Sequence, residues 1–188
     1  QRTNELATIE IQQFAKQFQN SEFLPNILLT GFRLAVRMGR TRDAINSGLD
    51  LWEGRVPKAT NEQRRSAAEL LASYLVAIGD IPRGLDLYQK LFRSSQSAND
   101  QRSYLWRAGV AALRVGEVDR ALTNLQGLVD RRPNGDLDPA SRYWLGVAQL
   151  YANDHTNART TFESVAEQFP YHYYGMRATE RLLPLTTN

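Results

Sequence analysis

The chain has 188 residues, 42% of them hydrophobic, which suffices for one domain or a short array of repeats around a buried core. Its 23 basic and 20 acidic residues leave a net charge of +3, a bias too weak to indicate nucleic-acid binding. No apolar run approaches the roughly 18 residues of a transmembrane helix, so membrane insertion is not expected. The absence of cysteine excludes disulfide bonds and cysteine metal sites.

The N-terminal part of the chain predicts three helices. Apolar residues at helical spacing indicate the first, over residues 4–18. The second is expected to begin near Pro25, because proline in the first turn loses no hydrogen bond, and to end at Gly39. A third helix is expected over residues 42–52. The last two form a degenerate helix pair within residues 21–56.

One pattern then recurs at a spacing of 37 residues. Its best copy consists of Gly109, Gly116, Ala121, Leu125 and Pro133. The following copy reads Gly146, Asn153, Ala158, Phe162 and Pro170, and the preceding one Ala72, Gly79, Gly84, Tyr88 and, in place of proline, Gln96. A repeat of this length predicts stacked supersecondary units that bury one another's apolar faces.

The marked positions have distinct expected roles. Glycine inside a helix costs about 1 kcal/mol relative to alanine, so Gly109 and Gly146 are expected where another helix backbone presses against them. Gly116 and Asn153 are expected to end the first helix of each pair in the left-handed conformation. The second helices carry a small residue at the crossing, a large one a turn later and a closing proline: Ala121 and Ala158, Leu125 and Phe162, Pro133 and Pro170.

Local signals set the boundaries of the pairs. Thr60 and Gln63 predict a capping box at the start of a first helix. The polar residues 94–100 are predicted to be a loop, and Asp138 is predicted to cap a helix that has Pro139 in its first position. The resulting helix pairs lie within residues 60–97, 98–134 and 138–170, and a terminal helix follows over residues 171–183.

This pattern resembles the tetratricopeptide repeat. That family has a small residue in each of two helices, a large residue four positions after the second small one, and a closing proline. Gly146, Ala158, Phe162 and Pro170 match it, as does the copy that begins at Gly109. The resemblance implies an all-α, right-handed superhelical solenoid of antiparallel helix pairs that forms a single domain over residues 1–188. It also implies a concave face, lined by the first helices, that binds a protein or peptide partner.

A narrower resemblance is to the superhelical domain of bacterial soluble lytic transglycosylases. Residues 143–146 (YWLG) are similar to one element of that domain, and residues 169–175 (FPYHYYG) with Ala178 to the next one. Residues 106–109 (WRAG) resemble the tryptophan-containing helix before them. Val147 departs from the family, which usually has arginine there. The resemblance implies a non-catalytic domain of a periplasmic or cell-envelope murein enzyme, with protein or murein glycan as partner.

No catalytic residue is predicted. Lytic transglycosylases use one acid in a Glu-Ser pair, followed by a Gly-Met-Gln element. Glu163 and Ser164 form such a pair, but no Gly-Met-Gln follows, and Met176 is succeeded by arginine. Glu163 is therefore predicted to be an ordinary helical glutamate and the chain not to be an enzyme, although its parent protein could carry a catalytic domain elsewhere.

Other site types find little support in the sequence. His155 and His172, the two histidines, lack metal-ligand spacing, and no glycine-rich phosphate loop occurs, so no metal and no cofactor are expected. Arg131 and Arg132 at a predicted helix end suit a solvated C-terminal cap, with an anion site as the alternative.

The face of the first helices carries the candidate binding residues. Trp106 and Tyr143 occupy equivalent positions 37 residues apart, and so do Arg114 and Tyr151, so these four are expected to line one groove. Aromatic rings with arginines suit sugar rings or peptide segments. The full candidate set is Glu69, Trp106, Arg107, Val110, Arg114, Tyr143, Trp144 and Tyr151. The alternative for the two tryptophans is a place in the core between repeats.

Three function classes remain open at this stage. The chain is expected to be a murein-enzyme domain, a free-standing envelope scaffold or a cytoplasmic adaptor that binds peptides. Its first residue is Gln1 rather than methionine, which suggests a processed chain or a fragment. The resemblance to murein enzymes implies the periplasm or cell envelope as the location, with the cytoplasm as the alternative.

Overall fold

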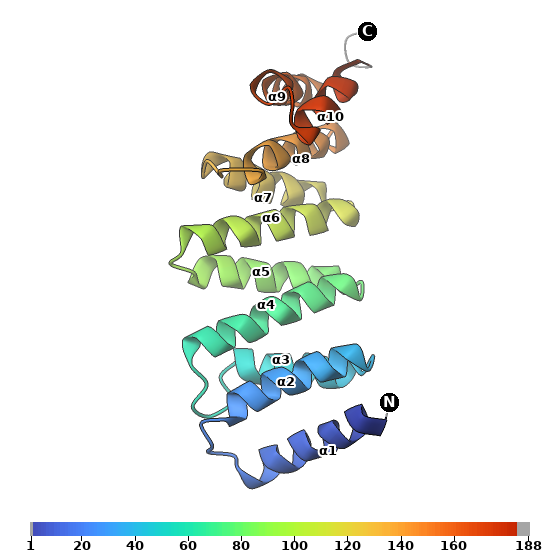
Figure 1. The fold of residues 1–188 in the computed structure, drawn as a ribbon. Coiled ribbons are helices and arrows are strands. Elements are labelled where there is room, and N and C mark those ends of the chain that lie inside the picture. Colours follow the sequence, from blue (N-terminus) through green and yellow to red (C-terminus); the bar gives the residue numbers. More distant parts are fainter. Residues whose placement is uncertain (1, 184–188) are drawn as a thin grey trace. The chain divides into compact units, whose positions relative to one another are not determined.

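The fold is all-α. A computed structural model describes residues 2–183, which form ten α-helices and contain no β-strand. The predicted all-α fold of antiparallel helix pairs is confirmed (Figure 1). The chain divides into two compact groups of helices, residues 1–87 and residues 88–188, here called the first and the second unit. Within the described part of the chain, no helix has the length and apolar character needed to cross a bilayer.

The first unit consists of four helices and the start of a fifth. They are α1 (Arg2–Gln17), α2 (Leu24–Arg37), α3 (Thr41–Trp52), α4 (Asn61–Ala77) and the first half of α5 (Ile81–Ser94). Helix α1 packs against α2, α2 against α3 and α3 against α4, and Leu24, Leu29 and Leu51 belong to a core cluster of this unit. The three predicted N-terminal helices are confirmed, and Pro25 lies in the first turn of α2 as expected.

The second unit continues the helix pairs. It holds the rest of α5, then α6 (Ala98–Arg114), α7 (Val118–Asp130), α8 (Leu137–Tyr151), α9 (His155–Gln168) and α10 (Tyr173–Leu182). From α6 onward each helix packs against its successor, and α8 also contacts both α6 and α10 (Figure 1). The first helices of successive pairs therefore lie next to one another, as stacking of repeats requires.

The turns within the pairs use left-handed residues, as the sequence predicts. Gly39, Gly79 and Gly116 have φ values of 69°, 90° and 74° at the ends of α2, α4 and α6. Asn153 takes the same role after α8 with a φ of 59°. Glycine has no side chain to clash in this conformation, and asparagine is less strained there than most residues, which explains why these two residue types occupy the turns.

A substitution at the asparagine turn tests this account. Asn153→Ala should lower the free energy of unfolding by about 1 kcal/mol, because alanine is strained in the left-handed region. Asn153→Gly should leave the free energy of unfolding unchanged or raise it slightly. Urea denaturation followed by circular dichroism measures both variants. Equal losses for glycine and alanine would show that the turn does not depend on this conformation.

The repeat glycines are required by the helix crossings. A Cβ atom on Gly109 would lie 2.7 Å from Cγ of Leu125, and one on Gly146 would lie 2.8 Å from Cε1 of Phe162. The close approach that the sequence predicts is confirmed, but the partner is a large side chain of the second helix rather than its backbone. Ala121 and Ala158 are fully buried, as their position in the pattern requires.

Two predicted boundaries need correction, and a third is confirmed. The loop at residues 94–100 is shorter than predicted, because the Ser97 hydroxyl accepts a hydrogen bond from the Asp100 amide and starts α6 at Ala98. Asp138 does not cap α8, which begins one residue earlier; its carboxylate instead accepts a 2.7 Å hydrogen bond from Nε of Arg142. The capping box of Thr60 and Gln63 is present.

Candidate binding faces

The predicted binding residues lie on three helices and differ in exposure. Glu69 is on α4 of the first unit; Trp106, Arg107, Val110 and Arg114 are on α6, and Tyr143, Trp144 and Tyr151 on α8 of the second. Arg107, Arg114 and Tyr151 are exposed, Tyr143 is buried, and the other four are half-buried. All the candidates except Glu69 belong to the second unit.

Tyr143 belongs to the core, and its expected place in an open groove needs correction. Its side chain is 4% exposed, and its ring centroid lies 5.6 Å from that of Phe162 and 5.3 Å from that of Tyr174. The physical reason is α10, which packs against both α8 and α9 and covers this face of α8. Trp144 packs against the same cluster and remains half-buried.

The polar edge of this core cluster lies on α10. Arg181 donates a long hydrogen bond of 3.5 Å to the Tyr143 hydroxyl. The pKa of Arg177 is raised above its ordinary value, mainly by the carboxylate of Glu180 and to a smaller extent by Tyr143. The Tyr143 hydroxyl therefore lies close to the side of α10 that carries Arg177 and Arg181.

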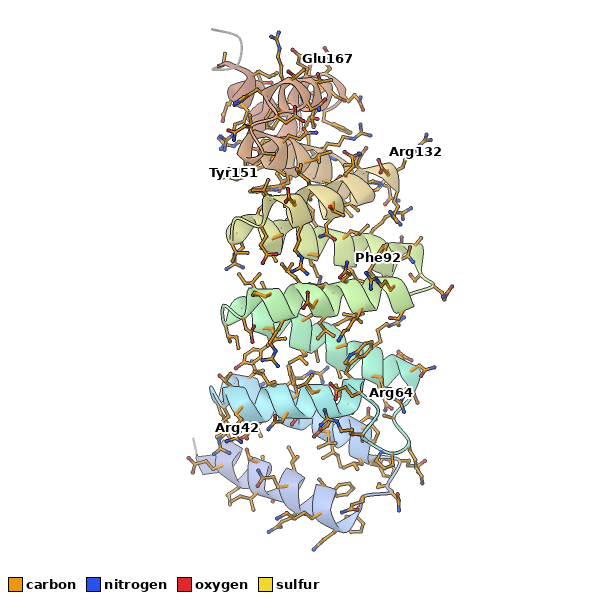
Figure 2. The ribbon with its side chains drawn as sticks, turned by 180° about the vertical axis from the view of Figure 1, so that it is seen from behind. Arg42, Arg64, Phe92, Arg132, Tyr151 and Glu167 are labelled. Atoms are coloured by element: carbon orange, nitrogen blue, oxygen red, sulfur yellow. The ribbon has the colours of Figure 1, made fainter. Side chains whose placement is uncertain are left out.

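The remaining candidates form a stripe on α6. Trp106, Val110 and Arg114 are four residues apart from one to the next, so they lie on one face of the helix; we call them the α6 stripe. Arg114 ends α6, and Tyr151, 64% exposed, ends α8. Figure 2 shows Tyr151 at one edge of the second unit and Arg132 at the opposite edge. The α6 stripe, together with the exposed Arg107 and Tyr151, is accessible, whereas Tyr143 is buried.

A second surface feature, absent from the sequence analysis, is a groove between α5, α6 and α7. Its volume is about 330 Å³, and we call it the back groove. Its principal lining residues are Phe92 and Arg93 of α5, Tyr104 and Ala108 of α6, and Gly127 and Arg131 of α7. Tyr104 and Ala108 precede Trp106 and Val110 by two residues, about 200° around the helix, so the back groove lies on the other side of α6 from the stripe.

The remaining polar candidates have structural roles. Glu163 accepts a 2.8 Å hydrogen bond from Nε of Arg159, an ordinary i,i+4 surface pair. The His172 ring accepts a hydrogen bond from the Tyr174 amide and caps α10. Arg131 donates from Nη1 to the Gly127 carbonyl oxygen at 2.8 Å, as a C-terminal cap does. Among residues 2–183, no three histidine, aspartate or glutamate side chains gather as a metal site would require.

Known proteins share this repeat and this fold. The family model of the tetratricopeptide repeat matches residues 107–173, from within α6 to the start of α10. No curated protein sequence matches the chain.

Two solved structures have a similar fold. The structure described as "MamA RS-1 ArsTM double mutant" has a TM-score of 0.61 and 14% identity, with 86% of this chain and 92% of that chain covered. The one described as "MamA MSR-1 C2" has a TM-score of 0.55 and 18% identity, with 87% and 92% covered. At these identities the likeness shows the fold alone, a helical-repeat solenoid. The resemblance to murein enzymes rests on its motif residues alone.

Proposed function

We propose that this chain is a non-catalytic scaffold that binds a protein or peptide partner through the α6 stripe and the neighbouring end of α8. The observation that carries the proposal is that half-buried Trp106 and exposed Arg114 lie on one face of α6, about two turns apart, where the match to the tetratricopeptide repeat begins. An aromatic ring and a guanidinium on one helix face supply an extended peptide with apolar area and a charged hydrogen-bond donor, and both residue types are enriched in binding hot spots.

The proposal predicts that binding depends on the stripe. Among dodecapeptides selected from a random displayed library on the full chain, one group should bind Arg114→Glu and Trp106→Ala at least tenfold more weakly than the wild type, as measured by fluorescence anisotropy. Arg159→Ala is the matched control, because Arg159 is an exposed arginine on the second helix α9 and makes only a surface ion pair. Unchanged thermal midpoints show that the variants are folded. A selection in which every peptide binds both stripe variants as tightly as the wild type would contradict the proposal.

A second candidate is the superhelical domain of a cell-envelope murein lytic transglycosylase, with murein as the ligand of the same stripe. What favours it is that two motif elements far apart in the sequence pack together. Tyr143 of the first element contacts Tyr174 of the second, and within the second element Gly175 lies against the Phe169 carbonyl group. The residues that carry the resemblance thus lie in one packed corner of the second unit.

Soluble murein fragments distinguish the two candidates. Under the second, their titration should change tryptophan fluorescence in the wild-type chain and much less in Arg114→Ala. Under the first, the fluorescence stays constant up to millimolar fragment while selected peptides still bind.

A further inference from the structure

We propose that the back groove is a second docking site, distinct from the α6 stripe, and that its occupant is a short acidic peptide segment of a partner protein with an aromatic or aliphatic side chain next to its carboxylates. The proposal rests on the function proposed above in one respect, that the chain binds protein. It adds a different surface, a different set of residues and the chemical class of the ligand.

The first observation is a glycine that packing does not require. A Cβ atom on Gly127 would meet nothing closer than 3.7 Å, at Nη1 of Arg131. By contrast, the helical glycines Gly84, Gly109 and Gly146 each have a neighbour within 2.8 Å of such an atom. Gly127 lies inside α7, where glycine costs about 1 kcal/mol relative to alanine and no positive φ demands it. Its effect is to leave the wall of the back groove open.

The second observation is the shape and the apolar character of the groove. Its volume of about 330 Å³ is at the lower end of the range for ligand pockets. Tyr104, Leu105 and Ala108 of α6 are buried beneath it, and the half-buried Phe92 forms one wall. This space accommodates one large side chain together with its neighbours along an extended peptide.

The third observation is charge. Arg93 and Arg131 line the groove, and no carboxylate does. Among the described residues, neither arginine forms an ion pair with an acidic side chain. The C-terminal ends of α5 and α7 each carry a partial negative charge of about half a unit. Together they cancel about one of the two positive charges of the guanidinium groups, so the mouth of the groove stays positive. An acidic segment is the complementary partner.

The arginine on α7 is already held in position. Its guanidinium carbon lies 5.0 Å from the centroid of the Phe92 ring, and its Nη1 donates to the Gly127 carbonyl oxygen. A guanidinium stacked on an aromatic face keeps further N–H donors for a carboxylate. Because less side-chain freedom is lost on binding, such a group binds a carboxylate at lower entropic cost.

Selection of dodecapeptides on the wild-type chain, with depletion on Gly127→Leu, tests this site. The leucine side chain fills the groove, and its Cβ makes only ordinary contacts, so Gly127→Leu should fold. We expect the selected peptides to contain several Asp or Glu residues beside an aromatic or aliphatic one. Their affinity should fall at least tenfold in Gly127→Leu and in Arg93→Ala combined with Arg131→Ala. Gln126→Leu, which adds the same side chain at the exposed neighbouring position, should not change it.

Several results would overturn the proposal. Selected peptides without acidic residues, or peptides that bind Gly127→Leu as tightly as the wild type, would do so. So would a dimer of the wild-type chain that becomes monomeric in Gly127→Leu, because a second copy would then occupy the groove. The stripe variants separate this outcome from failure of the proposed function, since Arg114→Glu should leave the groove-selected peptides bound.

Discussion

Phe162→Ala should lower the free energy of unfolding by about 3–5 kcal/mol, the range for phenylalanine truncated in a core. Phe162 is fully buried in the second unit and packs against Tyr143 and the backbone at Gly146. Its loss would leave a cavity at the crossing of α8 and α9, where both helices are held by the repeat pattern. Urea denaturation followed by circular dichroism measures the change.

Two further variants show whether the crossing is the cause. Tyr171→Ala removes an aromatic side chain that is 98% exposed and should change the free energy of unfolding by less than about 0.5 kcal/mol. Gly146→Ala should destabilise the wild type but cost less in the Phe162→Ala background, because the ring that its Cβ would meet at 2.8 Å is gone. Fully additive costs would show that the two residues do not share one crossing.

Gly175→Ala should be the most damaging single methyl addition. Its Cβ would lie 1.8 Å from the carbonyl oxygen of Phe169, so the backbone between α9 and α10 would have to shift. Overpacking typically costs about 1–3 kcal/mol, and we expect a loss of about 3 kcal/mol because the obstacle is backbone rather than a movable side chain. The thermal midpoint and the urea midpoint should both fall.

The matched control is the same substitution at Gly127. Gly127→Ala adds a methyl group to another helix of the second unit, where it meets only ordinary contacts, and should raise the free energy of unfolding by up to about 1 kcal/mol. Opposite signs for the two substitutions are the expected outcome. A loss of similar size at both positions would mean that helix glycines of this chain are equivalent, contrary to the packing described above.

Local sequence signals predicted most of the fold. The left-handed turns at Gly116 and Asn153 and the capping box at Thr60 depend on neighbouring residues, so they could be recognised from spacing alone. The close packing at Gly109 could also be predicted, because a fixed period repeats one local packing arrangement, but its partner, the Leu125 side chain, was not predicted. The start of α8 could not be predicted from the sequence, because an aspartate is favourable both in the first turn of a helix and at its N-cap, and Asp138 lies in the first turn.

The candidate site was harder to predict because it depends on contacts between helices. Tyr143 matches Trp106 in the repeat, but α10 covers it, and the repeat register alone does not show which face of α8 that helix covers. The back groove brings Phe92 next to Arg131 from helices almost 40 residues apart, which no local pattern reveals. Gly127 was the available signal: it falls outside the repeat pattern, in the interior of a predicted helix.

The measurement closest to the central claim is a map of peptide binding by two-dimensional NMR on the isotope-labelled chain. With a peptide selected on the wild type and lost on Arg114→Glu, the account predicts shifts of the Trp106 indole N–H and of the Val110 and Arg114 amides at the stripe. The Glu163 amide on α9 should not shift. Shifts confined to α9, or a bound peptide that leaves the Trp106 indole signal unmoved, would contradict the claim that this chain binds its partner through the first helices of its repeats.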